Sequence, residues 1–273
     1  MKENNSKISD ILMLSKDLDV SKYDESFLNK SVEKRMSDTH CDSKEAYYHY
    51  IQQSQTEAQQ FINSLSVCYS EFFRNPITFS ILERIILPSI IMRKTKSQQK
   101  EVRLWSAACA SGQETYSLSM LLNEYLNSSG ERISFRIFAT DQSGQAIEHA
   151  ICGRYSLTDL NNITIKRLNR WFTVEGNDYI INDELKTNID FSVFDLFSKQ
   201  HSAPPTSIFG DFDLIVCANL LFYYKPEYRK KIIDKIRHCL SSDGFLITGE
   251  TERDILVQSG FREVYPYSGI FQS

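Results

Sequence analysis

Two carboxylates, each placed at or just beyond the end of an expected buried strand, are the residues of this sequence with the clearest chemical potential. The run from Leu104 to Ser117 begins as an apolar strand, passes through small residues and continues as a helix that contains Glu114. A second apolar stretch, 135–140, ends in Asp141. In α/β folds an acid at such a strand end binds ribose hydroxyls, and small residues let the backbone approach a ligand. The pattern therefore indicates a pocket for a nucleoside-like ligand.

The turn between this strand and this helix holds a single glycine, Gly112. It does not match the three-glycine dinucleotide fingerprint, and it lacks the lysine of a P-loop. A bound pyrophosphate is therefore disfavoured, whereas S-adenosylmethionine carries adenine and ribose without phosphate. An ordinary strand, loop and helix, with Glu114 and Asp141 solvated at loop ends, explains the segment equally well. The segment alone does not decide between the two interpretations.

Four landmarks in this sequence resemble those of the CheR family of chemotaxis receptor methyltransferases, in the same order and along almost the whole chain. Ala150 to Tyr155 also resembles the family's Ala-x-x-Gly-x-Tyr, and Gly249 to Glu252 resembles its Gly-His-Ser-Glu. The four landmarks are Ser70 to Arg74 for Thr-x-Phe-Phe-Arg, Trp105 to Ser117 for Trp-Ser-Ala-x-x-Ser-Thr-Gly-Glu-Glu-Pro-Tyr-Ser, Ala139 to Asp141 for the second strand end, and Cys217 to Tyr224 for Cys-Arg-Asn-Val-x-Ile-Tyr-Phe.

The resemblance implies an α/β fold of the class I S-adenosylmethionine-dependent methyltransferases. This fold has a Rossmann-like, mostly parallel sheet, here with an N-terminal helical domain and a small antiparallel β insert. The implied reaction transfers a methyl group to a glutamate of a methyl-accepting receptor or similar signalling protein, leaving S-adenosylhomocysteine. A carboxylate with a pKa of about 4.3 is already ionised at neutral pH, so no general base is required.

The resemblance also implies roles for individual residues. Glu114 would meet the positively charged methionine end of the cofactor through charge-assisted hydrogen bonds. Asp141 would bind the ribose, Asn219 the methionine or ribose side, and Asp195 the region near the adenine. The implied catalytic residues are Arg74, which in the family projects from the helical domain toward the cofactor, and Tyr223, which could line the methyl channel; plain packing roles stay open for both. The implied cofactor-binding residues are Ser70, Arg74, Ala107, Glu114, Asp141, Asp195, Leu196, Asn219 and Leu220.

Several positions depart from the family pattern. Gln113, Thr115 and Ala218 stand where the family has glutamate, proline and arginine. Because Ala218 removes a charge near the expected site, a non-catalytic module that binds S-adenosylmethionine or S-adenosylhomocysteine remains an alternative. A methyltransferase acting on nucleic acid bases is disfavoured, since Asn219 is not followed by the Pro-Pro-aromatic sequence of those enzymes.

Composition limits the remaining possibilities. The 273 residues are 41% hydrophobic and 24% charged with a net charge of -4, so general affinity for nucleic acid is not expected. The six cysteines form no Cys-x-x-Cys pair, and we expect no metal site. No apolar run approaches the length of a membrane span, and no secretory segment is apparent at the N-terminus. The sequence therefore predicts a cytoplasmic protein with reduced thiols.

The leading part of the chain predicts a helical domain. The first proline is Pro76 and the first glycine is Gly112, so residues 1–75 lack both strong helix breakers. We place the junction at the polar, basic stretch 93–100, which gives a helical domain over 1–95 and a methyltransferase domain over 96–273. The expected helices cover 8–16, 25–38, 43–65 and 77–92, the last interrupted at Pro88.

Beyond residue 100 strands and helices alternate, which predicts a parallel sheet covered by helices on both faces. Ligands bind at the carboxyl ends of such strands, where Ser106, Asp141, Asp195 and Asn219 all fall. The expected strands cover 101–106, 134–140, 189–194, 212–218 and 244–249, and the expected helices cover 113–126, 143–151 and 226–240.

An insert over 156–188 interrupts this alternation. Its apolar stretches 171–174 and 179–181 flank Gly176 and predict a small hairpin. The hairpin could present an edge strand to which an extended receptor peptide adds, or it could simply cover the site. In the tail, 261–265 and 269–271 predict an antiparallel edge.

Overall fold

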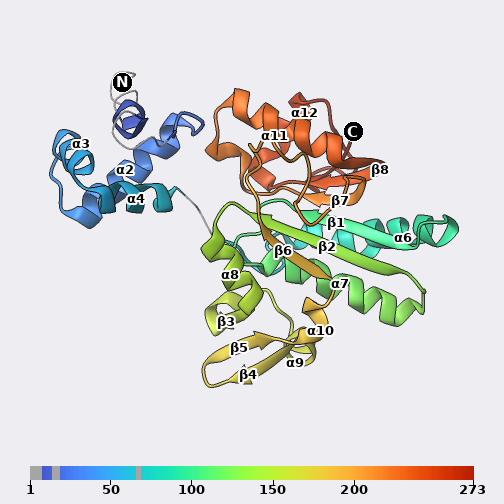
Figure 1. The fold of residues 1–273 in the computed structure, drawn as a ribbon. Coiled ribbons are helices and arrows are strands. Elements are labelled where there is room, and N and C mark those ends of the chain that lie inside the picture. The colour runs from blue at the N-terminus through green and yellow to red at the C-terminus, as the bar shows by residue number, and fades with distance from the viewer. Residues whose placement is uncertain (1–7, 14–18, 66–68) are drawn as a thin grey trace. The chain divides into compact units, whose positions relative to one another are not determined.

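The computed structural model describes residues 8–13, 19–65 and 69–273 and divides the chain into two compact units. One unit comprises 1–67 with 221–230, and the other comprises 68–220 with 231–273 (Figure 1). Residues 8–13 are helical, and the rest of the helix expected over 8–16 lies outside the described residues. In the described part of the chain no helix is long and apolar enough to cross a membrane.

The N-terminal unit is helical because its polar residues cap successive amphipathic segments. Asp24, Ser43 and Ser54 each accept a hydrogen bond from a backbone N–H of the helix that follows. The single helix expected over 43–65 is divided at Ser54, whose extended backbone ends one helix while its side chain caps the next. The helices are α2 (Glu25–Thr39), α3 (Lys44–Gln53) and α4 (Gln55–Ser64).

Segment 221–230 belongs to this helical unit. The backbone N–H of Asp24 donates to the carbonyl oxygen of Tyr223 at 2.8 Å. The rings of Tyr23 and Tyr224 stack with centroids 5.2 Å apart, and the Tyr223 ring lies 4.6 Å from that of Phe27. Tyr223 is therefore packed by aromatic neighbours of the helical unit.

A buried ion pair joins α2 to α4. Both carboxylate oxygens of Glu57, which is 2% exposed, accept from the Arg35 guanidinium at 2.9 and 2.6 Å. The hydroxyl of Tyr47 in α3 donates to the same carboxylate at 2.8 Å. One carboxylate thus ties three helices together.

The second unit is built on a seven-stranded, mostly parallel sheet, as expected. The strand order is β6-β2-β1-β7-β8-β10-β9, and β10 pairs antiparallel with both of its neighbours, β8 and β9, while the other pairs are parallel. Figure 1 shows α7 (Gln113–Ser129) and α11 (Pro226–Cys239) on opposite sides of this sheet. The strands are β1 (Glu101–Ser106), β2 (Ser134–Asp141), β6 (Ile189–Val193), β7 (Phe212–Val216), β8 (Leu240–Ile247), β9 (Arg262–Glu263) and β10 (Ile270–Gln272), and the other helices include α8 (Gly144–Cys152) and α12 (Arg253–Gln258).

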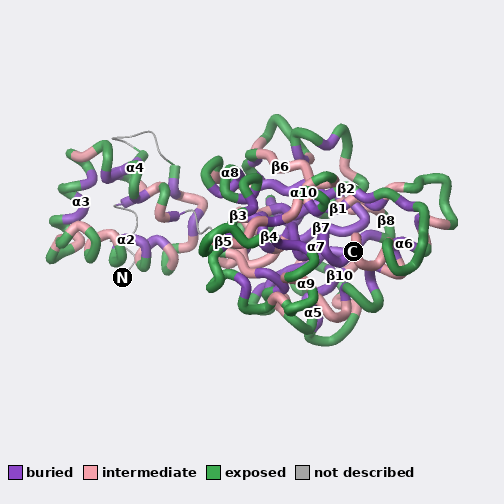
Figure 2. Tube along the Cα trace, turned by 90° about the horizontal axis from the view of Figure 1, so that it is seen from below, coloured by how far each residue is buried: buried purple, intermediate pink, exposed green. Residues whose placement is uncertain are grey.

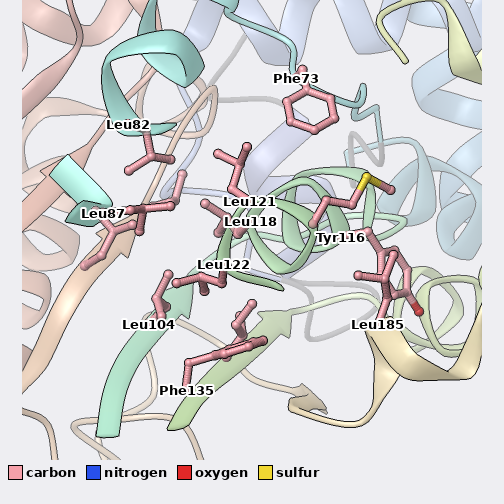
Figure 3. Packing of buried hydrophobic residues seen from close by; sticks show 14 of the residues in the cluster. Phe73, Leu82, Leu87, Leu104, Tyr116, Leu118, Leu121, Leu122, Phe135 and Leu185 are labelled. Atoms are coloured by element: carbon pink, nitrogen blue, oxygen red, sulfur yellow. The ribbon is translucent and has the colours of Figure 1, made fainter. Parts of the chain in front are cut away.

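The helices that precede the sheet pack on it. Leu82 and Leu87 are fully buried in one core with Leu104 of β1 and Leu118 of α7 (Figure 3). The structure therefore divides the chain between residues 67 and 68. We had expected this junction at residue 95. The apolar face of 76–96 is the reason, because the sheet and α7 are what bury it. The elements are α5 (Pro76–Ile81), a π-helical turn (Leu82–Ile86) and α6 (Leu87–Lys96).

The interruption expected at Pro88 takes the form of this π-helical turn. A proline has no N–H to donate to the preceding turn, and a wider turn before it accommodates the ring. Figure 2 shows that burial runs through the central strands, while the outer surfaces of the surrounding helices are exposed.

The insert is a three-stranded antiparallel sheet of order β3-β5-β4. The expected hairpin is confirmed, with Phe172 opposite Ile181 and Glu175 opposite Asp178. Gly176 occupies its two-residue turn with a φ of 64°, which glycine adopts readily. A third strand, which the sequence did not indicate, pairs with β5. The elements are β3 (Arg154–Ser156), α9 (Ile165–Trp171), β4 (Phe172–Glu175), β5 (Asp178–Ile181) and α10 (Asp183–Lys186).

We predict that Glu57→Gln destabilises the helical unit by about 3 kcal/mol, because it removes the buried anion of the Arg35 guanidinium, whose side chain is 14% exposed. Asp38→Asn is the matched control: this partner of Arg35 is 46% exposed and should contribute less than about 1 kcal/mol. Denaturant unfolding followed by circular dichroism measures both. Equal midpoints for the two variants would contradict the role given to the buried pair.

Candidate functional site

A cavity of about 310 Å³ opens at the carboxyl ends of β1, β7 and β8. Parallel sheets place ligands at this edge, because strand ends and helix starts meet there. The walls come from the segment before and within α5, from the start of α7, and from the residues after β7 and β8. The lining residues include Tyr69, Ser70, Glu71, Arg74, Ala108, Glu114, Ala218, Asn219, Gly249, Glu250 and Thr251.

Glu114 stands in the first turn of α7, directly after the tight turn at Gly112. Gly112 has a φ of 94°, and a Cβ there would lie 2.9 Å from the Ala150 side chain, so the position requires glycine. The Ser106 hydroxyl donates to the Glu114 carboxylate at 2.7 Å. Burial raises the pKa of Glu114 to about 7, against the opposing effects of the Ser106 hydrogen bond and the Arg74 charge. A cation in the cavity would therefore stabilise this carboxylate.

Asn219 follows β7 in the left-handed conformation, with a φ of 59°. Its backbone N–H donates to the Glu252 carboxylate at 2.7 Å. The same oxygen accepts from the Gly249 N–H at 3.1 Å and the Thr248 hydroxyl at 3.0 Å. Such backbone strain is retained where surrounding contacts enforce it, often at functional sites.

Glu252 is therefore a positioning residue that we did not assign from the sequence. It has no exposed surface, and its carboxylate supports the residues that line the cavity after β7 and β8. A Cβ at Gly249 would lie 2.9 Å from both Asn219 Oδ1 and Glu252 Oε2, so only glycine fits there. The Gly249-x-x-Glu252 spacing was the available signal, but it does not reveal which groups the carboxylate binds.

Asp141 ends β2, as expected, and holds the loop that follows the neighbouring strand. Its carboxylate accepts from the Ala110 N–H at 3.0 Å and the Ser143 N–H at 2.9 Å. Burial raises its pKa. We call residues 107–112 the cofactor loop. Asp141 does not line the cavity, but each carboxylate oxygen can still accept a further hydrogen bond.

Ser70 and Arg74 both line the cavity. Phe73, between them, is buried, and its N–H donates to the Ser117 hydroxyl of α7 at 3.1 Å. The exposed Arg74 guanidinium lies over the Tyr69 ring, 5.3 Å from its centroid. Arg74 thus belongs to the unit that contains the sheet. The resemblance had implied that it projects from the helical domain.

The other site residues expected from the sequence do not line the cavity. Ala107 is buried and donates its N–H to Val216 at 2.8 Å, leaving the neighbouring Ala108 at the cavity wall. Asp195 is exposed and accepts the Phe197 N–H at 2.9 Å. The remaining residues of this group are Leu196, Leu220 and Tyr223, and a cofactor or catalytic role for all five stays a prediction.

The cavity carries more negative than positive charge. Its acidic and basic side chains are the carboxylates of Glu71, Glu114 and Glu250 and the guanidinium of Arg74. S-adenosylmethionine fits this lining, since its sulfonium and ammonium groups would compensate the buried Glu114 carboxylate. No group of three metal-ligating side chains occurs in the described residues.

Family comparisons agree with this site. Residues 69–264 match the CheR methyltransferase S-adenosylmethionine-binding domain, and residues 6–66 match the CheR all-alpha domain. The chain belongs to the CheR methyltransferase family. Its S-adenosylmethionine-binding domain contains every residue that lines the cavity.

Individual relatives are chemotaxis methyltransferases and one much longer protein. Chemotaxis protein methyltransferase Cher2 of Pseudomonas putida is 30% identical over 71% of this chain and 69% of its own length. The chemotaxis protein methyltransferase of Escherichia coli is 30% identical over 72% of this chain and 64% of its own length. An uncharacterised 104.1 kDa protein of Rhodobacter capsulatus is 28% identical over 98% of this chain, which spans only 27% of that protein.

We predict that the affinity for S-adenosylmethionine rises as the pH rises through about 7, because Glu114 then loses its proton and becomes the anion that attracts the cofactor. Calorimetric titration of the wild type and Glu114→Gln on either side of this pH measures the effect. The amide cannot titrate, so its affinity should change less with pH. Identical pH dependence in both proteins would contradict the assignment.

Proposed function

We propose that this protein transfers a methyl group from S-adenosylmethionine to a glutamate carboxylate of a methyl-accepting receptor or similar signalling protein. The observation that carries the proposal is the acidic cavity at the carboxyl edge of the sheet, with Arg74 exposed beside it. The relatives named chemotaxis protein methyltransferases support this substrate class. We place the activity in the cytoplasm, where unpaired thiols such as those of Cys217 and Cys239 stay reduced.

The cofactor, when bound, supplies a methyl group on a sulfonium. Glu114 and Asn219 would hold its methionine end, with the Ser70 hydroxyl nearby. Asp141 would bind the ribose hydroxyls while it keeps the cofactor loop in place. Asp195 is assigned to the region near the adenine, and Ala107, Leu196 and Leu220 are assigned to cofactor binding, as the resemblance implies.

The acceptor side needs orientation more than acid–base chemistry. A glutamate carboxylate is already ionised at neutral pH, and no histidine lines the cavity. Among the lining side chains only Arg74 is cationic, because residue 218, which also lines the cavity, is alanine where the family has arginine. A guanidinium can bind a carboxylate through two parallel hydrogen bonds and fix its direction. Arg74 would thus align the acceptor, and we propose Tyr223 as the second catalytic residue.

Incubation with methyl-labelled S-adenosylmethionine and receptor fragments tests this function. We expect label in a base-labile ester, and we expect this label to be lost when the acceptor glutamates are replaced by alanine. The alternative, suggested by Ala218, is a signalling module that binds the cofactor without turnover. Tight binding of S-adenosylhomocysteine with no ester on any receptor fragment would support that alternative and refute the proposal.

We predict that Arg74→Ala lowers methyl transfer at least about tenfold, because the acceptor loses the group that orients it. Cofactor affinity and stability should change little. Arg84→Ala is the matched control, since Arg84 is exposed and outside the cavity lining. Single-turnover rates with saturating cofactor make the comparison, and an unchanged rate for Arg74→Ala would reduce Arg74 to a surface residue.

We propose in addition that the small sheet docks an extended receptor peptide. Its order leaves β4 at an edge, with Val174 58% exposed, so a peptide strand could add by backbone pairing. Thr173→Pro and Val174→Pro each remove one backbone N–H of β4. Because successive N–H groups of a strand point to opposite sides, one of these two variants removes an N–H of the open edge.

For that variant we predict a larger loss of methylation on receptors that carry their C-terminal tail than on tail-less fragments. Cofactor affinity should be retained, because no residue of β4 lines the cavity. Initial rates on the paired substrates measure the difference. An equal loss on both substrates would favour a sheet that only covers the site.

A further inference from the structure

We propose that Tyr155 is a positioning residue that couples the small sheet to the cofactor loop. The inference rests on the proposed binding of the cofactor beside this loop. Tyr155 lies in β3, where it is paired opposite Tyr179 of β5, and its side chain is 1% exposed. Neither tyrosine lines the cavity, so any effect on the cofactor must pass through other residues.

The Tyr155 hydroxyl reaches the cofactor loop at its last turn. It donates to the carbonyl oxygen of Ser111 at 2.6 Å. A Cβ at Gly112 would lie 3.2 Å from the same hydroxyl oxygen, so the phenol also lies close against this glycine. The hydroxyl is therefore bonded to Ser111 and lies against Gly112, the last two residues before the helix that carries Glu114.

The Tyr155 ring contacts the segment that carries Arg74. Phe72 meets it edge-on, with centroids 5.0 Å apart and an interplanar angle of 80°. Phe73, the next residue, is bonded through its N–H to Ser117 of α7. One side chain of the small sheet thus touches both the loop before Glu114 and the turn before Arg74.

The hydroxyl complements the bond made by Asp141. That carboxylate holds the loop at Ala110, and the Tyr155 hydroxyl holds it at the next residue, Ser111. The loop is also held by the N–H groups of Ala107 and Cys109, which donate to Val216 and Thr140. A loop that loses one of its bonds visits more conformations, and a ligand must then select the competent one at a cost in apparent affinity. Loss of the hydroxyl should therefore weaken cofactor binding while the ring keeps its packing.

Tyr116 offers a matched control. It is also buried, and its hydroxyl donates at the same distance, 2.6 Å, to a backbone carbonyl. That carbonyl belongs to Ala150 in α8 and not to the cofactor loop. Tyr116→Phe and Tyr155→Phe thus remove equivalent hydrogen bonds from the same unit.

The test compares the two phenylalanine variants in the full chain by calorimetric titration of S-adenosylhomocysteine. Tyr155→Phe should weaken binding roughly 3- to 10-fold, as the loss of one hydrogen bond predicts, and Tyr116→Phe less than about twofold. The KM for S-adenosylmethionine should rise in Tyr155→Phe with kcat retained. Without ligand, amide exchange in residues 107–112 should be faster in Tyr155→Phe alone.

Equal affinities of Tyr155→Phe and the wild type would overturn the inference and leave the proposed function standing. Equal weakening in both variants would also overturn it, because general loosening would then explain the result. A wild type that binds no S-adenosylhomocysteine would refute the proposed function itself, and the inference with it.

Discussion

Two carboxylates, the buried Glu252 and the half-buried Asp141, hold the functional edge of this protein by accepting backbone N–H groups. Asp141 holds the loop after β1 at Ala110, and Glu252 holds the chain after β7 at Asn219. Loops at the end of a parallel sheet carry amides that the sheet no longer satisfies, and buried amides need partners. A carboxylate is a strong acceptor for them. These bonds fix the position of each loop, and residues of both loops line the cavity.

The same arrangement sets the charge of the site. The carboxylates that line the wall make a negative environment, and burial raises the pKa of Glu114 to about 7. Such a cavity is costly when empty of cations and favours a positively charged ligand. Arg74 at the mouth supplies the opposite charge, where an anionic acceptor would approach. In the proposed function, cofactor and acceptor would thus be attracted to different parts of one cavity.

The sheet could be predicted from the sequence because short apolar strands alternate with helices of clear period. The domain junction could not be predicted in this way, because the apolar face of 76–96 has the same pattern whether it packs on a sheet or on other helices. The break at Ser54 was missed because a capping serine does not interrupt the apolar pattern. Glu114 and Asn219 were placed at the cavity by residue resemblance. The backbone bonds of Glu252 were not foreseen, because spacing does not reveal which amides a carboxylate accepts.

Calorimetric titration of S-adenosylhomocysteine into the wild type and Asp141→Ala tests the central claim most directly. We expect micromolar-range affinity for the wild type and a loss of roughly 1 to 3 kcal/mol in the variant, the range for a hydrogen bond to a charged group. Asp190→Ala is a suitable control, because its carboxylate pairs with Arg136 on the sheet surface away from the cavity. No binding by the wild type, or equal binding by Asp141→Ala, would contradict the account.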